Sequence, residues 1–460
     1  MEVTKLGKEL VFKTLRHEKT ERVPWIPFAG VHAGKLKNYT AKEVLMDEDK
    51  LYNSLIEVHK LYVPDGMPIM FDLQIEAEIL GCELLWAEFN PPSVSKHPYS
   101  QDGSGYPTDD MIPSKEDGRI PMVLNTMKRV KESIGDDTAL YGLVCGPLTL
   151  ASHLRGSTFF MDMFSNTELV ENFMSFCTKV AIKISEYYID AGMDVIAIVD
   201  PLVSQVSPKF FSKLMGSHFK AIFDYLREKN VPSSFFVCGN ATKQIRVMCE
   251  TYPDSIHVDE NVILADAKKV TDEFNIALGG NIPLTTTMLF GNQQDNMKCV
   301  IDLLDSIEDH KNLLLSPGCD MPYDTPIENT VAVAQAALHT DAAREMVKNY
   351  EAVEDDFDHI EIPDYENLDK VLIELFTLDP EQCAACTYMV NSVVDIYDEI
   401  KDIADYTVYQ YNRKDDIART KKMGLKNLPT MVINGEPKFI SIIPSKQELI
   451  VAVNKAKKQV

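Results

Sequence analysis

The feature that most constrains the fold is a regular alternation of short apolar runs with longer helical patterns between about residue 20 and residue 345. Continuous apolar strands need helices over both faces of their sheet, so the alternation predicts an α/β fold with a parallel sheet closed into a (β/α)8 TIM barrel. The eight runs are Val23–Phe28, Met67–Phe71, Leu140–Val144, Val195–Val199, Ser234–Val237, Ser255–Val258, Ile276–Leu278 and Leu313–Leu315.

Polar and reactive residues follow several of these runs. Asp200 follows the fourth run, Asn240 the fifth, Asp259 the sixth and Asn281 the seventh. Barrel enzymes take their catalytic residues from the carboxyl ends of the strands, so the pattern predicts an enzyme. Asp200 is expected to act in catalysis and the other three in substrate binding. A turn or a helix cap is the alternative role for each of them.

Two cysteines occupy equivalent positions after the fifth and eighth runs. They are Cys238, in Phe236-Val237-Cys238-Gly239-Asn240, and Cys319, in Ser316-Pro317-Gly318-Cys319-Asp320. Strand ends of a barrel meet at its mouth, so two thiols from distant parts of the chain are expected to meet there and hold a soft metal. The alternative is a metal-free redox pair that Cys383 reduces by thiol–disulfide exchange.

A second pair of cysteines, Cys383-Ala384-Ala385-Cys386, lies in a separate pattern of elements. We expect a barrel domain over residues 1–345, an acidic linker over 346–365 and a small α/β domain over 366–460. The order of the small domain resembles a thioredoxin or glutaredoxin fold, with Pro429 at the place where that family carries a cis-proline. The resemblance implies that Cys383 attacks disulfides and Cys386 resolves them. The predicted strands and helices are 371–376, 387–402, 407–411, 415–423, 431–433, 438–443 and 446–457.

Charge and hydropathy exclude several classes of partner. The formal net charge is −24, and no run of Lys and Arg is long enough to follow a phosphate backbone, so nucleic acid is not an expected partner. The first residues lack the apolar core of a signal peptide, and no apolar stretch is long enough to cross a membrane. We therefore expect a cytoplasmic protein whose nine cysteines are mostly reduced.

Several local sequences resemble the uroporphyrinogen decarboxylase superfamily. They include Gly146-Pro147-Leu148-Thr149-Leu150-Ala151, Gly279-Gly280-Asn281 and the Ser316–Cys319 segment. Within the superfamily, Glu76-Ala77-Glu78-Ile79-Leu80-Gly81-Cys82 resembles the corrinoid (methylcobamide) methyltransferases. True decarboxylases carry an arginine-bearing segment where this chain has Ala29–Gly34 without arginine. The resemblance thus favours methyl transfer over decarboxylation.

The resemblance implies a site and partners. In those methyltransferases a His-x-Cys segment and a later cysteine hold zinc, which matches Cys238 and Cys319, but position 236 is Phe. A third ligand is expected from Glu76, Glu78, His257, His153 or the substrate thiol. Glu76 and Glu78 are also expected to be catalytic. The implied partners are a corrinoid protein that carries the methylcobamide and a small-molecule thiol that accepts the methyl group. Whether the protein forms a homodimer is left open by the sequence.

Four interpretations therefore compete. The first is a corrinoid-dependent methyltransferase with a thiol–disulfide accessory domain. The second is a thiol–disulfide redox protein, the third a decarboxylase of a porphyrinogen or another small acid, and the fourth a binding module without turnover. Metal analysis separates the first two, and arginines at the mouth would indicate the third.

Overall fold

The computed structural model describes residues 7–101, 103–351, 359–378, 384–425 and 427–457, which form two compact units. The first unit is Met1–Tyr350 and the second is Glu351–Val460. Most of the acidic stretch that we predicted as the linker, from residue 352 to residue 358, lies outside the described residues. Each unit has its own hydrophobic core, so each is described by itself.

A parallel sheet forms the centre of the first unit, in the order β1-β4-β5-β6-β7-β8-β9. The first predicted run contributes a single bridge, from Trp25 to Leu315 in β9. The Trp25 carbonyl also accepts from the N–H of Asp65, next to β1, at 2.9 Å. Trp25 therefore stands between β9 and β1 and closes the ring, so all eight predicted runs take part in the barrel. The strands are β1 Gly66–Pro68, β4 Ala139–Cys145, β5 Val195–Val199, β6 Ser233–Val237, β7 Ser255–Val258, β8 Ala277–Ile282 and β9 Leu313–Pro317.

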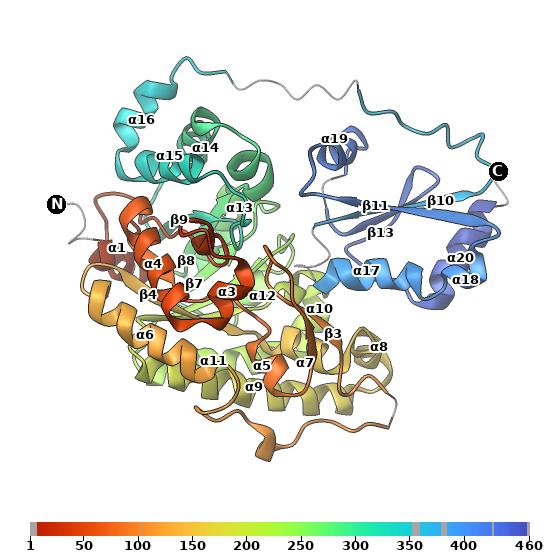
Figure 1. Ribbon diagram of the computed structural model, residues 1–460, viewed down its shortest axis with the longest axis horizontal. Helices are drawn as coiled ribbons and strands as arrows, with labels where there is room; N and C mark the ends of the chain where they lie inside the picture. Colours follow the sequence, from red (N-terminus) through yellow and green to blue (C-terminus); the bar gives the residue numbers. More distant parts are fainter. Residues whose placement is uncertain (1–6, 102, 352–358, 379–383, 426, 458–460) are drawn as a thin grey trace. The chain divides into compact units, whose positions relative to one another are not determined.

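Helices follow the strands and pack on the outside of the ring (Figure 1). The helix α6 (Ile120–Ile134) shows why: its buried side chains Val123, Met127, Val130 and Ile134 recur at helical spacing on one face. The other helices of eight or more residues in this unit are α1 Gly7–Leu15, α4 Glu48–Tyr62, α7 Pro147–Arg155, α8 Thr158–Ser165, α9 Thr167–Asp190, α11 Gly216–Glu228, α13 Leu264–Glu273, α14 Gln293–Asp305, α15 Ile327–Leu338 and α16 Thr340–Val347.

Aromatic rings fill the barrel below the carboxyl ends of the strands. Phe236 packs against Phe28 and Phe71, with ring centroids 4.7 and 5.9 Å apart, and all three side chains are buried. Cys238 and Cys319 pack against the same cluster from above. We call Phe28, Phe71 and Phe236 the aromatic floor. It closes the barrel interior, so a site at this end is bounded from below.

A two-stranded hairpin, β2 (Glu83–Leu85) with β3 (Ser93–Lys96), lies between α5 (Ile75–Ile79) and α6. Its residues are half-buried or exposed, and it carries no continuous apolar run. The sequence pattern therefore gave no signal for it.

The second unit contains a four-stranded sheet in the order β11-β10-β12-β13. The strand β10 (Val371–Thr377) pairs parallel with β11 (Ala404–Gln410) and antiparallel with β12 (Thr430–Ile433), which forms a hairpin with β13 (Glu436–Ile440). Its helices are α17 Ala384–Val394, α18 Tyr397–Ile400, α19 Lys414–Lys422 and α20 Lys446–Lys457.

Several element boundaries in this unit differ from the prediction, including the strand expected over 438–443, which is β13 at Glu436–Ile440. The helix expected over 387–402 is two helices, because a turn at Asp395 and Ile396 separates α17 from α18. The strand expected from residue 407 begins at Ala404, because it pairs along the whole of β10 from Val371 onward. Across the described ranges, every helix is too short or too polar to span a lipid bilayer.

Candidate active site

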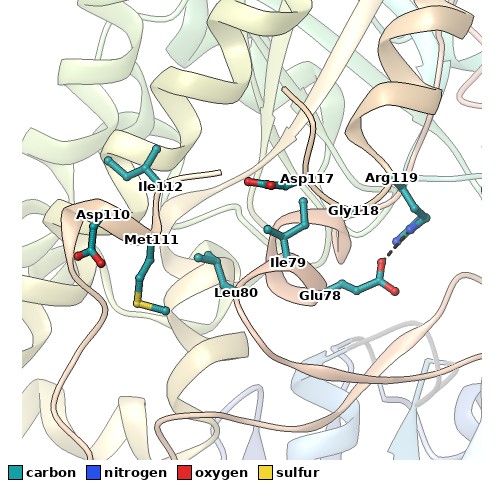
Figure 2. A pocket seen from close by; sticks show the side chains of 9 residues that line it. All are labelled: Glu78, Ile79, Leu80, Asp110, Met111, Ile112, Asp117, Gly118 and Arg119. Carbon is teal, nitrogen blue, oxygen red and sulfur yellow. Dashed lines mark hydrogen bonds and ion pairs between the residues drawn. The ribbon is translucent and has the colours of Figure 1, made fainter. Parts of the chain in front are cut away.

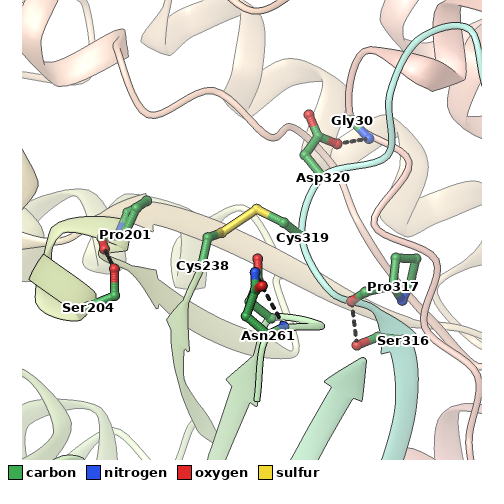
Figure 3. Close-up of a disulfide and its surroundings, with 10 residues drawn as sticks. Gly30, Pro201, Ser204, Cys238, Asn261, Ser316, Pro317, Cys319 and Asp320 are labelled. Carbon is green, nitrogen blue, oxygen red and sulfur yellow. Dashed lines mark hydrogen bonds between the residues drawn. A yellow bond between two sulfur atoms is a disulfide. The ribbon is translucent and has the colours of Figure 1, made fainter. Parts of the chain in front are cut away.

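The two cysteines predicted at the barrel mouth are joined to each other (Figure 3). Cys238 directly follows β6, and Cys319 follows β9 after Gly318. Their Cα atoms lie 5.9 Å apart and a disulfide links them. Both residues are half-buried, whereas Cys82, Cys145, Cys177 and Cys249 are buried. The two sulfur atoms at the mouth are therefore more exposed to solvent than these four thiols.

The residues around this pair do not fit a zinc ion with three protein ligands. Phe236 occupies the position of the expected histidine, and its ring is part of the aromatic floor. Among the described residues, no group of three His, Cys, Asp or Glu side chains is placed to hold a metal. Catalytic zinc normally has three protein ligands and one open position. The metal site expected from Cys238 and Cys319 is therefore not formed by this set of residues.

The proposed third ligands have other environments. His257 is buried in the barrel, where its Nδ1 lies 2.9 Å from the Ser234 hydroxyl and its ring packs at 5.5 Å from Phe236. His153 is buried in α7, and within the described part of the chain neither of its ring nitrogens has a hydrogen-bond partner. Burial lowers the pKa of both imidazoles, to about 3, so both rings are neutral at pH 7.

Asp200 connects β5 to the first turn of α7. One carboxylate oxygen accepts from the Leu148 N–H at 2.9 Å, and the other accepts from the Thr149 hydroxyl at 2.6 Å. Burial raises the pKa of Asp200 to about 7. Gly146 makes this approach possible, because a Cβ there would lie 2.3 Å from Asp200 side-chain atoms. Both oxygens of Asp200 are thus engaged by the first turn of α7, and its catalytic role stays a prediction.

Glu76 and Glu78 have different partners, and their catalytic roles stay predictions. Glu76 is only 1% exposed, and its Oε1 accepts from the Cys145 N–H at 3.3 Å at the end of β4. Burial raises the pKa of Glu76 to about 7. Glu78 instead accepts from Arg119 Nε at 2.8 Å. Of the two, Glu76 is the buried group.

The predicted substrate-binding residues hold their own loops together. Asn281 donates through Nδ2 to the carbonyls of Asp259 and Val262, at 2.9 and 2.7 Å. The Asp259 carboxylate accepts from the Asn261 N–H at 2.9 Å, and burial raises its pKa. Asn240 accepts from the Thr242 hydroxyl at 2.7 Å. These contacts organise the loops at the mouth, and the substrate-binding roles of these residues stay predictions.

Two further acidic residues flank the disulfide and were not predicted. Asp320 accepts from the Gly30 N–H at 2.8 Å, and burial raises its pKa (Figure 3). The Glu260 side chain lies against Gly318, because a Cβ added to Gly318 would lie 2.5 Å from Glu260 Oε2. The sequence could have indicated both, because Asp320 directly follows Cys319 and Glu260 directly follows Asp259. With Asp200 and Asp259, they make the mouth rich in carboxyl groups.

A cavity of about 560 Å³ lies beside Glu78 and Arg119 (Figure 2). Arg119 donates to Asp72 and Glu78, and its Cζ lies 5.0 Å from the centre of the Trp86 ring. Its single positive charge therefore already faces two carboxylates. The lining residues are Glu78, Ile79, Leu80, Asp110, Met111, Ile112, Asp117, Gly118 and Arg119.

In the second unit, Cys383 lies outside the described residues. Cys386 is buried in α17. The peptide bond between Leu428 and Pro429, just before β12, is cis.

Comparison with known proteins places the first unit in a family. A family model described as Uroporphyrinogen decarboxylase (URO-D) matches residues 6–339. The Methylcobamide:CoM methyltransferase MtbA of Methanosarcina acetivorans is 27% identical over 341 residues, which cover 72% of this chain and 97% of that protein. The Methylcobamide:CoM methyltransferase MtaA of Methanosarcina barkeri is 31% identical over 281 residues, which cover 59% of this chain and 79% of that protein.

A solved structure gives the same result for the fold. The methyltransferase from Methanosarcina mazei superposes with a TM-score of 0.65 at 25% identity, and the match covers 74% of this chain and 99% of that one. The family model ends at residue 339, before the second unit begins. Since that model matches well over half of the sequence, the chain belongs to the uroporphyrinogen decarboxylase family.

Proposed function

We propose that the first unit is a cobamide-dependent methyltransferase, which moves a methyl group from a methylcobamide carried by a corrinoid protein to a small thiol such as CoM. The observation that carries the proposal is the match to a methylcobamide:CoM methyltransferase over 97% of that protein's length. The family model, which matches residues 6–339, includes every strand of the barrel. The superposition on a solved methyltransferase supports the same activity.

The charge of the mouth disfavours decarboxylation of a porphyrinogen. Such a substrate carries several carboxylates and needs cationic groups to bind them. The segment Ala29–Gly34 carries no arginine. Arg119 is already paired with Asp72 and Glu78. The carboxyl groups of Asp200, Asp259, Glu260 and Asp320 offer no cation to such a substrate.

The reaction needs the acceptor sulfur without its proton. A thiolate attacks the methyl carbon in line, the cobalt–carbon bond breaks, and the cobalt leaves as Co(I) with both bonding electrons. We propose Glu76 as the acceptor of the thiol proton, because a buried carboxyl group with a pKa of about 7 is balanced for proton transfer near neutral pH. The barrel positions the thiol and excludes water from it.

The direct experiment incubates the full chain, under argon and with reduced thiols, with methylcobalamin and CoM. The expected result is loss of the methyl–cobalt absorbance together with formation of the methylated thiol, detected by mass spectrometry. Release of carbon dioxide from a porphyrinogen, with no methylated thiol, would support decarboxylation instead.

The role of Glu76 has its own test. Glu76→Gln is expected to lower the transfer rate and to remove the ionisation near pH 7 from the rate profile. Glu83→Gln is the matched control, because Glu83 is an exposed partner of Lys96. A profile that keeps its ionisation in Glu76→Gln would assign the proton to another group.

We further propose that the second unit is a thioredoxin-like thiol–disulfide module. Its element order of strand, two helices, strand, helix, two strands and helix supports this, as does the Cys383–Cys386 spacing. In a Cys386→Ser variant, the alkylation rate of Cys383 should report a pKa well below the ordinary value of about 8.5. An ordinary pKa would leave the unit as a docking domain.

A further inference from the structure

The disulfide at the mouth joins strands that are not neighbours. Cys238 follows β6 and Cys319 follows β9, and β7 and β8 lie between these strands in the sheet. The bond therefore bridges the opening of the barrel and does not tie adjacent strands together (Figure 3). It also closes a loop with a sequence separation of 81 residues.

The surroundings favour sulfur–sulfur chemistry over metal binding at this pair. The Cα separation of 5.9 Å lies within the range that a disulfide spans without backbone movement. Below the pair, Phe236 takes the place of a third metal ligand and packs into the aromatic floor. Both cysteines are half-buried, so a reductant can reach them, unlike the buried Cys145 and Cys177.

We propose that Cys238 and Cys319 form a reversible dithiol–disulfide couple that opens and closes the barrel mouth. A dithiol reductant supplies two electrons and two protons. The Cys238–Cys319 bond breaks, each sulfur becomes a thiol, and the reductant becomes a disulfide. Oxidation by a disulfide reverses the step. In the closed form the bridge lies over the aromatic floor, whereas in the open form two thiols face the space in which an acceptor would react.

The expected loss of methyl transfer on disulfide formation rests on the proposed function. The existence of the Cys238–Cys319 dithiol–disulfide couple does not. A trivalent arsenical such as phenylarsine oxide bonds to two thiols that lie close together and does not bond to a disulfide. It therefore reports the open form without any turnover. The Cys383–Cys386 pair would bind the same probe, so the measurement uses a full chain carrying Cys383→Ser.

The experiment equilibrates this chain in buffers of reduced and oxidised dithiothreitol, traps free thiols with iodoacetamide and identifies the modified cysteines by mass spectrometry. Cys238 and Cys319 are expected to become protected together as the buffer becomes more oxidising. Stoichiometric arsenical binding is expected only in the reduced chain. Cys238→Ser and Cys319→Ser should each abolish that binding, and Cys299→Ser is the matched control because Cys299 is half-buried and in α14.

Methyl transfer is then measured on the oxidised and reduced chains. The proposal expects loss of transfer on oxidation and its recovery on reduction. Alkylation of both cysteines in the most oxidising buffer, or equal transfer by both forms, would overturn it. A couple that titrates while neither form transfers a methyl group would support the couple and contradict the proposed function.

Discussion

At the residue scale, similar carboxyl groups at the mouth have different environments. Asp200 and Glu76 are both buried, and burial raises the pKa of each to about 7. Asp200 has both oxygens engaged at the start of α7, whereas Glu76 accepts from the Cys145 N–H through Oε1. The sequence predicts that acidic side chains gather at this end. It does not predict their partners, which come from other strands.

The buried Glu76 should make stability depend on pH. Its pKa rises from 4.5 in the unfolded chain to about 7 in the folded one, so the folded state keeps a proton that the unfolded state has released. Stability therefore falls as the pH rises from 4.5 to 7, by about 3 kcal/mol if the shift is fully expressed.

Glu76→Gln removes this pH dependence, because glutamine carries no charge and keeps an oxygen for the Cys145 N–H. We expect the variant to be more stable than the native chain at pH 8, by about 1–3 kcal/mol, and similar to it at pH 5. Urea unfolding at the two pH values measures the difference. An equal effect at both values would mean that Glu76 ionises normally.

Phe236 explains why zinc does not fit, and a substitution tests this explanation. Phe236→His would place a nitrogen ligand two residues before Cys238, as in the His-x-Cys pattern. We expect weak zinc binding by the reduced native chain, tighter binding by Phe236→His and no gain in Phe236→Leu, which controls for the altered floor. Equilibrium dialysis of zinc against each of the three reduced proteins measures these affinities. Tight, stoichiometric zinc in the native chain would show that another residue completes the site.

At the scale of elements, the apolar runs were sufficient to predict the barrel. Each run is buried on both sides, and all of the predicted strands are present as strands or as the Trp25 bridge. The hairpin β2–β3 was missed because it lies on the surface. The contact of Asp320 with Gly30 was missed because it joins residues 290 positions apart. A single sequence does not indicate which distant segments come into contact, so it does not predict such pairings.

A buried ion pair holds the second unit together. Glu374 in β10 and Arg419 in α19 are both almost fully buried and bonded to each other. Arg419 also donates to the Glu361 carbonyl at 2.6 Å, which fixes the segment before β10. Removal of one member leaves the other charge buried without compensation.

We therefore expect Arg419→Met to destabilise the second unit by about 3–5 kcal/mol. Lys401→Met is the control, because Lys401 and Asp398 form an exposed pair and its loss should leave unfolding unchanged. Calorimetry of the full chain measures both. A transition that does not move in Arg419→Met would show that the pair contributes nothing to this unit.

At the scale of the whole molecule, two units with separate cores combine a barrel of the uroporphyrinogen decarboxylase family with a small α/β unit outside the family match. The boundary between residues 350 and 351 lies close to the predicted end of the barrel domain at residue 345. The alternation of strands and helices predicted the barrel of the first unit, and the thioredoxin-like fold of the second unit stays a prediction. The choice between methyl transfer and decarboxylation depends on the few groups at the mouth, and the similarity to methylcobamide:CoM methyltransferases supports methyl transfer.

The central claim is that the barrel moves a methyl group from cobalt to sulfur. The most direct test supplies the reduced full chain with methylcobalamin carrying a 13C-labelled methyl group and with CoM, and follows the label by NMR. The account predicts that the label moves from the cobalt-bound methyl signal to an S-methyl signal, and that boiled protein does not support this movement. A label that stays on cobalt, in the presence of reduced Cys238 and Cys319, would contradict the account.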